Sequence, residues 1–329
     1  MTEFRKSSRI WVLLDHRAGN RSQCLGVADA LGLPYEHREL VYSWRGALPN
    51  GLIGRSFTGL SQLTRSEIVP PWPDIVIAAG RRTAPVARQI KRLSEGRTRL
   101  VQIMWPGNTG YQEFDLIAVP RHDNNLKNNN IINVLGSPHQ VTGEILRTLK
   151  GEWLSRLAGL PSPYLALIVG GTTKNRTFTD TMAIELANQA SQLARQTGSS
   201  LLVTTSRRTG EAADLLIGSL KGPARVYRWG DAGENPYLAF LACADAIIVT
   251  GDSMSMCSEA CSGTGPVYIY APSALITAKH KRLHDDLFAA GFARPLSDNH
   301  TTWHHAPLNC ATEIAREIKT RFDLEPRDA

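Results

Sequence analysis

Cysteines and long apolar runs are both scarce in this chain. Its 329 residues include five cysteines, and no two of them form a CxxC pair. An odd number of cysteines without such spacing argues against a disulfide framework and is typical of reduced thiols in the cytoplasm. The first apolar run covers five residues before Asp15, too short for a signal-peptide core or a membrane-spanning helix. We therefore expect a cytoplasmic protein, peripheral at most on the inner face of a membrane.

The chain also lacks the fingerprints of several nucleotide-binding and nucleic-acid-binding classes. The strand end at Gly170 and Gly171 fits neither GxGxxG nor GxxxxGK[ST], which argues against dinucleotide-dependent dehydrogenases and P-loop enzymes. The net charge of +7 suits a phosphorylated ligand, an anionic lipid or a nucleic acid. Because the basic residues are dispersed and no DNA-reading or RNA-reading motif occurs, we expect no nucleic-acid partner.

Short apolar runs alternate with helical or loop segments along both halves of the chain. Continuous hydrophobicity in these runs indicates strands buried on both faces, and hence parallel sheets covered by helices. The length suits two domains, and Pro161 and Pro163 mark a boundary because they stop the preceding helix. We predict an α/β protein of two Rossmann-like domains, 1–160 and 161–329, whose strand ends face a shared cleft. A last helix, from about Asn309 to Phe322, can pack on either domain.

The run from Thr250 to Ala260 joins a buried strand directly to a helix start. Hydroxyls, backbone N–H groups and the partial positive charge of a helix N-terminus predict a phosphate-binding site there. Glu259 falls one turn into the helix, where its carboxylate is placed to accept hydrogen bonds from a ribose. The alternative is an ordinary capped helix, with Ser253 as N-cap and Glu259 solvated. The candidate ligand-binding residues of this run are Asp252, Ser253, Met254, Ser255 and Glu259.

Three further strand ends in the second half add glycines, cations and an aromatic ring. Glycines allow close backbone approach, and arginines clamp a diphosphate through paired hydrogen bonds. Trp229 is suited to stack on a base, and Asn235 is expected to cap a helix that has Pro236 at its first position. Singly, each residue is as common on an ordinary surface, but together they predict a pocket for a nucleoside diphosphate. The residues are Gly170, Gly171, Thr172, Lys174, Arg176, Ser206, Arg207, Arg208, Trp229 and Asn235.

The first domain offers candidates for the second substrate. A loop from Asp15 to Gly26 follows the first strand and opens a helix. A carboxylate or imidazole in this loop is suited to take a proton from an acceptor hydroxyl, and His16 is preferred over Asp15 as the base. The alternative is a solvated loop histidine. The acceptor-side candidates are Gly19, Asn20, Gln23 and Arg81.

Two pairs at i,i+4 spacing resemble metal ligands. Cys257 and Cys261 share one predicted helix, but no two further ligands accompany them, so core packing is the preferred interpretation. For His280 and His284 we favour a helix flank that faces solvent, for the same reason. We expect neither a metal nor a cofactor.

The segment from Tyr42 to Arg65 mixes apolar residues with Arg45, Arg55 and Arg65 and contains no acidic residue. This composition is typical of an interfacial helix on anionic lipid. The alternative, an amphipathic segment that covers the sheet, is the preferred interpretation.

Several longer blocks carry a family resemblance that spans nearly the whole chain. They resemble the bacterial and plant mitochondrial-fission "elongated mitochondria" family, whose members are similar to GT-B glycosyltransferases such as lipid A disaccharide synthase and the peptidoglycan N-acetylglucosaminyltransferase. The blocks are DHRAGNRSQCLGVADALGL, PDIVIAAGRRTAPVA, FDLIAVPRHD, LLVTTSRRTG and GENPYLAFLACADAIIVTGDSMSMCSEACSGTGPVYIY, of which the last is the specific one.

The resemblance implies that the second domain holds a nucleotide-sugar donor. By this carry-over Ser253, Met254, Ser255 and Glu259 contact the donor, and the donor pocket is bordered by Gly170, Gly171 and Arg207. It also implies a rival role, because plant members act as adaptors that recruit a dynamin-like protein to the mitochondrial surface.

The preferred hypothesis is a metal-independent GT-B glycosyltransferase. It would transfer a sugar from a nucleoside-diphosphate donor to a cell-envelope glycolipid or polysaccharide acceptor, with peripheral contact to an anionic membrane. The alternatives are a non-enzymatic membrane-surface adaptor and a nucleotide-sugar epimerase.

Overall fold

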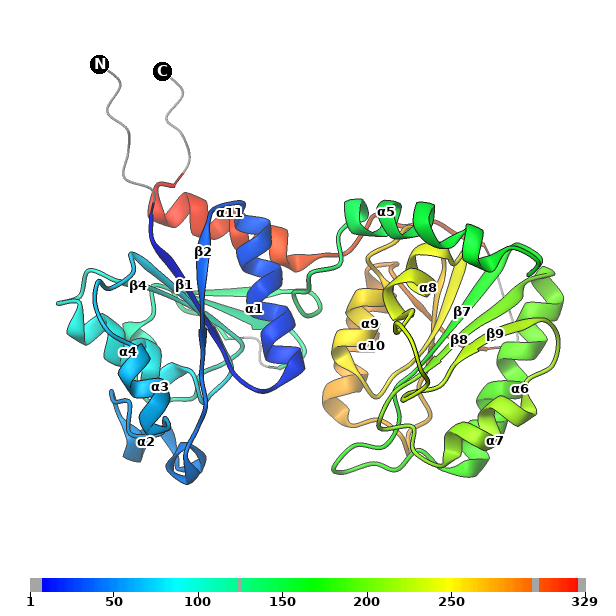
Figure 1. The fold of residues 1–329 in the computed structure, drawn as a ribbon, viewed down its shortest axis with the longest axis horizontal. Coiled ribbons are helices and arrows are strands. Elements are labelled where there is room, and N and C mark those ends of the chain that lie inside the picture. Colours follow the sequence, from blue (N-terminus) through cyan, green and yellow to red (C-terminus); the bar gives the residue numbers. More distant parts are fainter. Residues whose placement is uncertain (1–7, 124–125, 298–301, 325–329) are drawn as a thin grey trace, which may run out of the picture. The chain divides into compact units, whose positions relative to one another are not determined.

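The computed structural model describes residues 8–123, 126–297 and 302–324. The chain forms two compact units: unit 1 comprises Met1–Gln140 and Cys310–Ala329, and unit 2 comprises Val141–Asn309. Each unit contains a six-stranded sheet in which all neighbouring strands are parallel (Figure 1). The predicted pair of parallel-sheet α/β domains is confirmed.

The sheet of unit 1 has the strand order β2-β1-β3-β4-β5-β6. After β1 the chain adds β2 on one side and β3 on the other, so the strand order reverses between β1 and β3. The elements of unit 1 are β1 (Ile10–Leu14), α1 (Ala18–Leu31), β2 (Tyr35–Glu39), η1 (Trp44–Ala47), α2 (Asn50–Ile53), α3 (Gln62–Glu67), β3 (Ile75–Ala79), α4 (Ala84–Leu93), β4 (Arg99–Ile103), η2 (Tyr111–Glu113), β5 (Leu116–Pro120), β6 (Ile131–Val134) and α11 (Cys310–Phe322).

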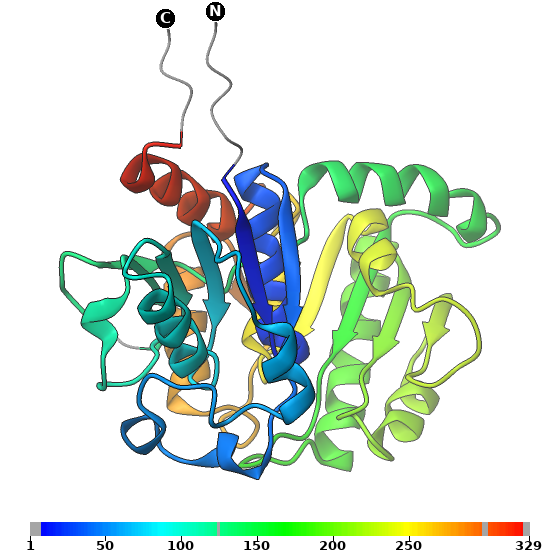
Figure 2. The same cartoon turned by 60° about the vertical axis from the view of Figure 1, so that its left-hand side comes forward.

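Both faces of this sheet are covered by helices (Figure 2). The strand β1 shows why, because its five residues are all buried and its side chains alternate between two cores. Ile10, Val12 and Leu14 join the core that contains α1 and α11, whereas Trp11 and Leu13 join the core that contains α4. A continuous apolar run therefore corresponds to a strand buried on both faces, as expected.

The sheet of unit 2 has the strand order β12-β11-β10-β7-β8-β9. Here the order reverses between β7 and β10, since β8 and β9 lie on one side of β7 and β10 lies on the other. The elements of unit 2 are α5 (Gly143–Trp153), η3 (Ser155–Leu157), β7 (Tyr164–Val169), α6 (Asp180–Thr197), β8 (Ser200–Thr205), α7 (Ala212–Ser219), β9 (Ala224–Tyr227), α8 (Tyr237–Cys243), β10 (Ala246–Thr250), α9 (Met254–Ala260), β11 (Val267–Tyr270), α10 (Ala278–Ala289) and β12 (Arg294–Pro295).

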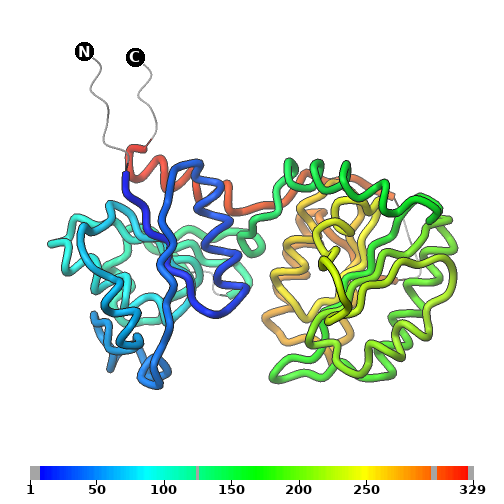
Figure 3. The backbone as a smooth tube through the Cα atoms, viewed as in Figure 1, coloured from blue at the N-terminus to red at the C-terminus, as the bar shows by residue number. Residues whose placement is uncertain are grey.

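The unit boundaries differ from the expected division at residue 160. The helix α5 belongs to unit 2, because Trp153 packs edge-on against Phe240 of α8 and shares a core with Tyr164. At the other end of the chain, α11 belongs to unit 1 and packs on α1. Figure 3 shows this return of the chain, with α11 in red. The prolines do end the helical stretch before β7, but they lie inside unit 2.

The segment from Tyr42 to Arg65 is not one interfacial helix. It forms the short elements η1, α2 and α3, and several of its large apolar side chains are exposed. Within the described parts of the chain, no helix is both long enough and apolar enough to cross a membrane.

Candidate functional site

Four neighbouring strand ends of unit 2 carry the predicted ligand-binding residues. The strands β10, β7, β8 and β9 are consecutive in the sheet and parallel, so their carboxyl ends lie along one edge. Open α/β sheets bind ligands at this edge, beside the point where strand order reverses, which here falls between β7 and β10. The structure thus brings together residues that are up to about 90 positions apart in the sequence.

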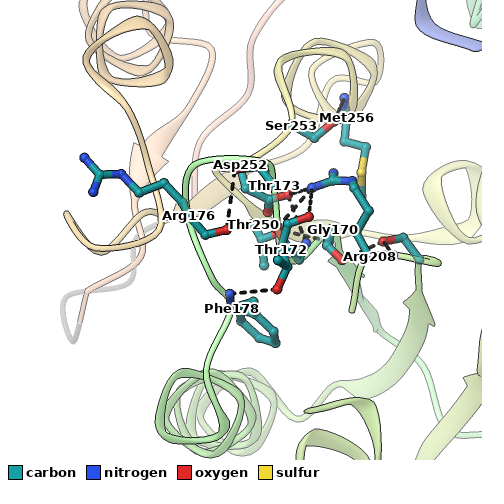
Figure 4. A network of polar contacts seen from close by, with 12 residues as sticks. Gly170, Thr172, Thr173, Arg176, Phe178, Arg208, Thr250, Asp252, Ser253 and Met256 are labelled. Atoms are coloured by element: carbon teal, nitrogen blue, oxygen red, sulfur yellow. Dashed lines mark hydrogen bonds and ion pairs between the residues drawn. The ribbon is translucent and has the colours of Figure 1, made fainter. Parts of the chain in front are cut away.

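Asp252 lies at the centre of this edge (Figure 4). Its side chain is fully buried and its Oδ2 accepts hydrogen bonds from the Gly171 N–H at 2.9 Å and from Arg208 Nη1 at 2.5 Å. Its Oδ1 is also buried and has no hydrogen-bond partner among the described residues. Asp252 therefore ties the loops after β7, β8 and β10 to one another.

Gly170 and Gly171 serve this packing of the loops. A Cβ atom on Gly170 would clash with the Asp252 carboxylate, and one on Gly171 would clash with the Arg208 carbonyl. Gly171 also has φ = +135°, a conformation that side chains with a Cβ rarely adopt. The two glycines let three loops meet closely.

Hydroxyl groups complete the loop network. The Thr250 hydroxyl accepts from the Gly170 N–H at 2.7 Å, and the Gly170 carbonyl accepts from the hydroxyls of Ser206 (2.6 Å) and Thr209 (2.7 Å). Sequence reasoning missed Thr209 and Thr250, because a threonine at a strand end carries no distinctive signal. It also assigned Ser206 and Arg208 to the ligand, whereas both are engaged by the fold.

Two cations remain available at this edge. Arg207 and Lys174 are exposed, and neither side chain makes a hydrogen bond or ion pair with the described residues. By contrast, Arg176 donates from Nε to the Ile276 carbonyl at 3.0 Å and points away from Asp252 in Figure 4. Thr172 accepts from the Phe178 N–H through its hydroxyl. The predicted group of cations is therefore reduced to Arg207 and Lys174.

The short helix α9 begins with the expected cap. Ser253 occupies the N-cap position, and its hydroxyl accepts from the Met256 N–H at 3.4 Å. Met254 and Ser255 follow in the first turn and are partly buried. The capped-helix interpretation is thus correct for Ser253, and Ser255 keeps a hydroxyl without a described partner.

Glu259 is neither solvated nor free. Its Oε2 accepts a hydrogen bond of 2.5 Å from the Tyr237 hydroxyl, which sequence reasoning missed. Burial raises the pKa of the Glu259 carboxyl, and the hydrogen bond from Tyr237 opposes this rise. Burial, reinforced by Glu259, raises the pKa of Tyr237 well above its ordinary value. The hydrogen bond holds the carboxylate of Glu259, near the end of α9, in a defined position.

The residues before α8 differ slightly from expectation. The helix begins at Tyr237 with Pro236 in the cap position, and Asn235 Oδ1 accepts from the Tyr237 N–H at 3.1 Å. Asn235 therefore caps the helix from one residue further out. Trp229 follows β9, and half of its surface (52%) is exposed. This indole is available for stacking.

The two histidines expected to face solvent are buried. His284 is 2% exposed, and its ring lies against Gly251, where a Cβ atom would clash with it. Burial, followed by the influence of His280, lowers the pKa of His284 to about 4. The Cys257 thiol lies 3.9 Å from His284 Nε2, in the interior as predicted for Cys257. In the part of the chain that the structure covers, no three His, Cys, Asp or Glu side chains are grouped to hold a metal ion.

In unit 1, one of the two candidate bases is held by hydrogen bonds and the other is exposed. Asp15 is buried, and its two oxygens accept from the Arg17 N–H (3.0 Å) and from Asn20 Nδ2 (2.8 Å). His16 is exposed and makes no hydrogen bond within the described chain. Asp15 therefore holds the loop in shape, and the His16 side chain is left without a described partner.

The acceptor-side candidates also include exposed residues and residues that are buried or bonded to the protein. Gly19 is exposed at the start of α1, whereas Gln23 is buried and its Oε1 has no partner among the described atoms. Arg81 donates from Nη1 to the Leu48 carbonyl at 2.9 Å, so it supports the η1–α2 segment instead of presenting a free cation.

Two solved structures share the architecture. A UDP-GlcNAc 2-epimerase from Methanocaldococcus jannaschii matches with a TM-score of 0.56 at 12% identity, over 95% of this chain and 99% of that chain. The kitacinnamycin glycotransferase matches with a TM-score of 0.52 at 13% identity, over 97% of this chain and 94% of that chain. At these identities the likeness concerns the fold alone, and together with the two parallel sheets it confirms the predicted GT-B class.

Sequence relatives identify the family. An uncharacterised protein of Rickettsia prowazekii is 29% identical, over 94% of this chain and 97% of its own length. The mitochondrial fission protein ELM1 of Arabidopsis thaliana is 27% identical, over 80% of this chain and 68% of its own length. The family profile described as mitochondrial fission ELM1 matches residues 18–322. The chain therefore belongs to the mitochondrial fission ELM1 family.

Proposed function

We propose that this chain is a GT-B glycosyltransferase that binds a nucleoside-diphosphate sugar on unit 2 and transfers the sugar to a glycolipid or glycan acceptor. One observation carries the proposal: four adjacent strand ends at the reversal point of the unit 2 sheet present free cations, an exposed indole and a positioned carboxylate. Each group has a complementary part in a nucleoside diphosphate.

Arg207 and Lys174 are assigned to the diphosphate, because they are the exposed cations at this edge without a described protein partner. A guanidinium group binds phosphate oxygens through two parallel hydrogen bonds. Glu259 is assigned to the ribose, since its second oxygen remains available while Tyr237 holds the first. Trp229 is assigned to the base through stacking.

The transfer needs charge stabilisation and a base. As the bond between the sugar and the diphosphate breaks, negative charge develops on the leaving diphosphate, and cations already in place stabilise it without reorganisation. His16 is assigned as the base that takes the proton of the acceptor hydroxyl as its oxygen bonds to the sugar carbon. Asp15 positions the loop that carries His16.

Exposed apolar residues in the segment 41–69 support a lipid-borne acceptor. Trp44, Leu52 and Leu63 are 75%, 76% and 71% exposed. The Arg45 guanidinium carbon lies over the Trp44 ring, 5.3 Å from its centroid. Apolar side chains beside a cation suit the surface of an anionic membrane. We therefore propose peripheral contact with a membrane through this segment.

A ligand screen tests the proposed donor site. Nucleoside diphosphates and their sugars should raise the melting temperature, because ligands that bind only the folded state stabilise it. Arg207→Gln should lower the affinity for the stabilising ligand about tenfold or more, as expected for a lost charge-assisted hydrogen bond. Arg195→Gln, which alters an exposed cation in the last turn of α6, is the matched control. No stabilisation by any nucleotide would refute the donor site.

The family relationship supports a second candidate, a non-enzymatic adaptor, because one relative is named as a mitochondrial fission protein. Turnover separates the two candidates: an adaptor produces no nucleoside diphosphate from any sugar nucleotide. An epimerase, the activity named for one structural neighbour, would convert the donor to an isomer without an acceptor. Product analysis by NMR therefore distinguishes all three.

A further inference from the structure

Hydrogen-bond donors without acceptors gather at the carboxyl edge of the unit 1 sheet. Tyr42, Arg17 and Arg82 follow β2, β1 and β3, which are consecutive in that sheet. The loop after β3 contacts the first turn of α1, which follows the loop after β1, since a Cβ atom on Gly80 would come within 2.8 Å of Asn20 Nδ2. The three donors therefore belong to one small region beside the reversal of strand order.

The side chains of Tyr42 and Arg82 face each other. The Arg82 guanidinium carbon lies 5.8 Å from the centre of the Tyr42 ring. The Tyr42 hydroxyl and Arg82 Nε are both buried, and neither has a hydrogen-bond partner among the described residues. Buried donors are normally satisfied, because each unpaired one costs about 1–3 kcal/mol. An external acceptor would remove this cost.

No protein carboxylate supplies that acceptor in the described chain. Neither Arg17 nor Arg82 forms an ion pair there. Asp15 lies close enough to act on the pKa of Tyr42, but its two oxygens already accept from Arg17 N–H and Asn20 Nδ2. Burial and then Asp15 raise the pKa of Tyr42, whereas Arg82 and Arg17 lower it, so both cations act on the region around this hydroxyl.

We infer that Arg17, Arg82 and Tyr42 form a binding site on unit 1 for a phosphate or diphosphate group. Phosphate offers several acceptor oxygens around one centre, which suits two guanidinium groups and one hydroxyl donor. The assignment of this group to the acceptor rests on the proposed function, and it makes the acceptor a phosphorylated or diphosphorylated carrier. The anion site itself stands on the unit 1 geometry alone.

Residue-resolved hydrogen exchange of the full chain with inorganic pyrophosphate tests the site. Pyrophosphate should slow amide exchange in residues 15–20 and 80–83. The concentration for half protection should rise about tenfold or more in Arg82→Gln and by a smaller factor in Tyr42→Phe, because the first loses a charged donor and the second a neutral one. Arg97→Gln is the control, since Arg97 is 76% exposed on the turn before β4, at the opposite end of the sheet.

The outcomes separate this site from the donor site. Protection confined to the loops of unit 2 would overturn the inference. So would an equal rise of the half-protection concentration in Arg82→Gln and Arg97→Gln. If Arg82→Gln fails to fold, Tyr42→Phe and Arg17→Gln carry the test, because one is nearly isosteric and the other alters an exposed side chain. A nucleoside diphosphate that slows exchange nowhere in unit 2 would refute the donor site and leave the unit 1 result intact. A lipid-linked diphosphate that competes with pyrophosphate would identify the carrier as its source.

Discussion

Tyr237 donates its phenolic hydrogen to Glu259 Oε2 across 2.5 Å, which joins the start of α8 to α9. Because the folded state raises the pKa of Glu259 above 4.5, it holds this proton more tightly than the unfolded state does. The free energy of unfolding therefore falls as pH rises from 4.5 through the folded pKa. A largely buried carboxylate that opposes stability at neutral pH is typical of a functional group.

Glu259→Gln should consequently keep or raise the melting temperature at pH 7.5 while weakening nucleotide affinity. The lost hydrogen bond to a ribose corresponds to about 1.5–3 kcal/mol, or about tenfold and more in affinity. The stability difference from wild type should shrink towards pH 4, where the carboxyl is protonated in both states. Calorimetry and thermal melts check both parts, and unchanged nucleotide affinity in a folded variant would remove Glu259 from the donor site.

Tyr237→Phe tests the pair from the other side. The Tyr237 hydrogen bond lowers the pKa of Glu259, so its removal should raise that pKa further. The acidic limb of nucleotide binding should then move to higher pH. Affinity measured across pH 5–8 gives the answer, and superimposable profiles for Tyr237→Phe and wild type would contradict the positioning role.

His284 should make the fold sensitive to acid. Its pKa in the folded state is about 4, below the ordinary value of 6.5, so the unfolded state takes up the proton first as pH falls. The stability linked to His284 is present above pH 6.5 and is lost between pH 6.5 and 4, by roughly 3 kcal/mol. Urea unfolding should show a steeper loss over this interval in wild type than in His284→Gln. Parallel pH profiles of the two proteins would disprove this linkage.

Membrane contact through the segment from Tyr42 to Arg65 should depend more on its exposed apolar side chains than on its three arginines. Arg65 donates to the carbonyls of Leu60 and Thr58 and so supports the local fold. The replacement of Trp44, Leu52 and Leu63 by serine should abolish co-sedimentation with anionic liposomes, and Arg45→Ser should weaken it, with binding that fades at high salt. Leu215→Ser, an exposed apolar residue of α7, is the control. Binding that is absent at low salt, or unaffected by the triple replacement, would exclude this anchor.

The sequence predicts the buried strands well, because continuous apolar runs leave few alternatives. It misses β2, whose residues YEHRE carry no apolar pattern and lie at the sheet edge. An edge strand needs only backbone pairing to β1, which no side-chain period records.

The site is predicted to the level of strand ends and no further. Which of two adjacent arginines is free depends on contacts across the edge: Arg208 turns to Asp252 and Arg207 does not. The burial of His280 and His284 had a readable signal, because Leu283 and Leu287 share their helical face at i+3 and i+7 from His280. The pairing of Tyr237 with Glu259 had none, since it joins two helices separated by a strand.

The loop that carries His16 provides the last test of the proposed enzyme. His16→Ala should lower the rate of sugar transfer by about 10² to 10⁴, the usual contribution of a general base, and should leave nucleotide affinity on unit 2 unchanged. Asp15→Asn should also lower the rate, but for a different reason. Its side chain can no longer accept from both the Arg17 N–H and Asn20, so the loop loses its shape while the base remains.

The pH profile of the rate distinguishes these two causes. Loss of His16 should abolish the limb that reports ionisation of the base, whereas Asp15→Asn should lower the rate at every pH and keep the limb. Arg97→Gln, a change on the turn before β4 at the opposite end of the unit 1 sheet, should leave both rate and profile as in wild type. Donor turnover that neither His16→Ala nor Asp15→Asn alters would retain the transferase and reject this loop as its base. Turnover absent from the wild-type protein with every sugar nucleotide and acceptor would instead favour the adaptor, for which neither substitution should change partner recruitment.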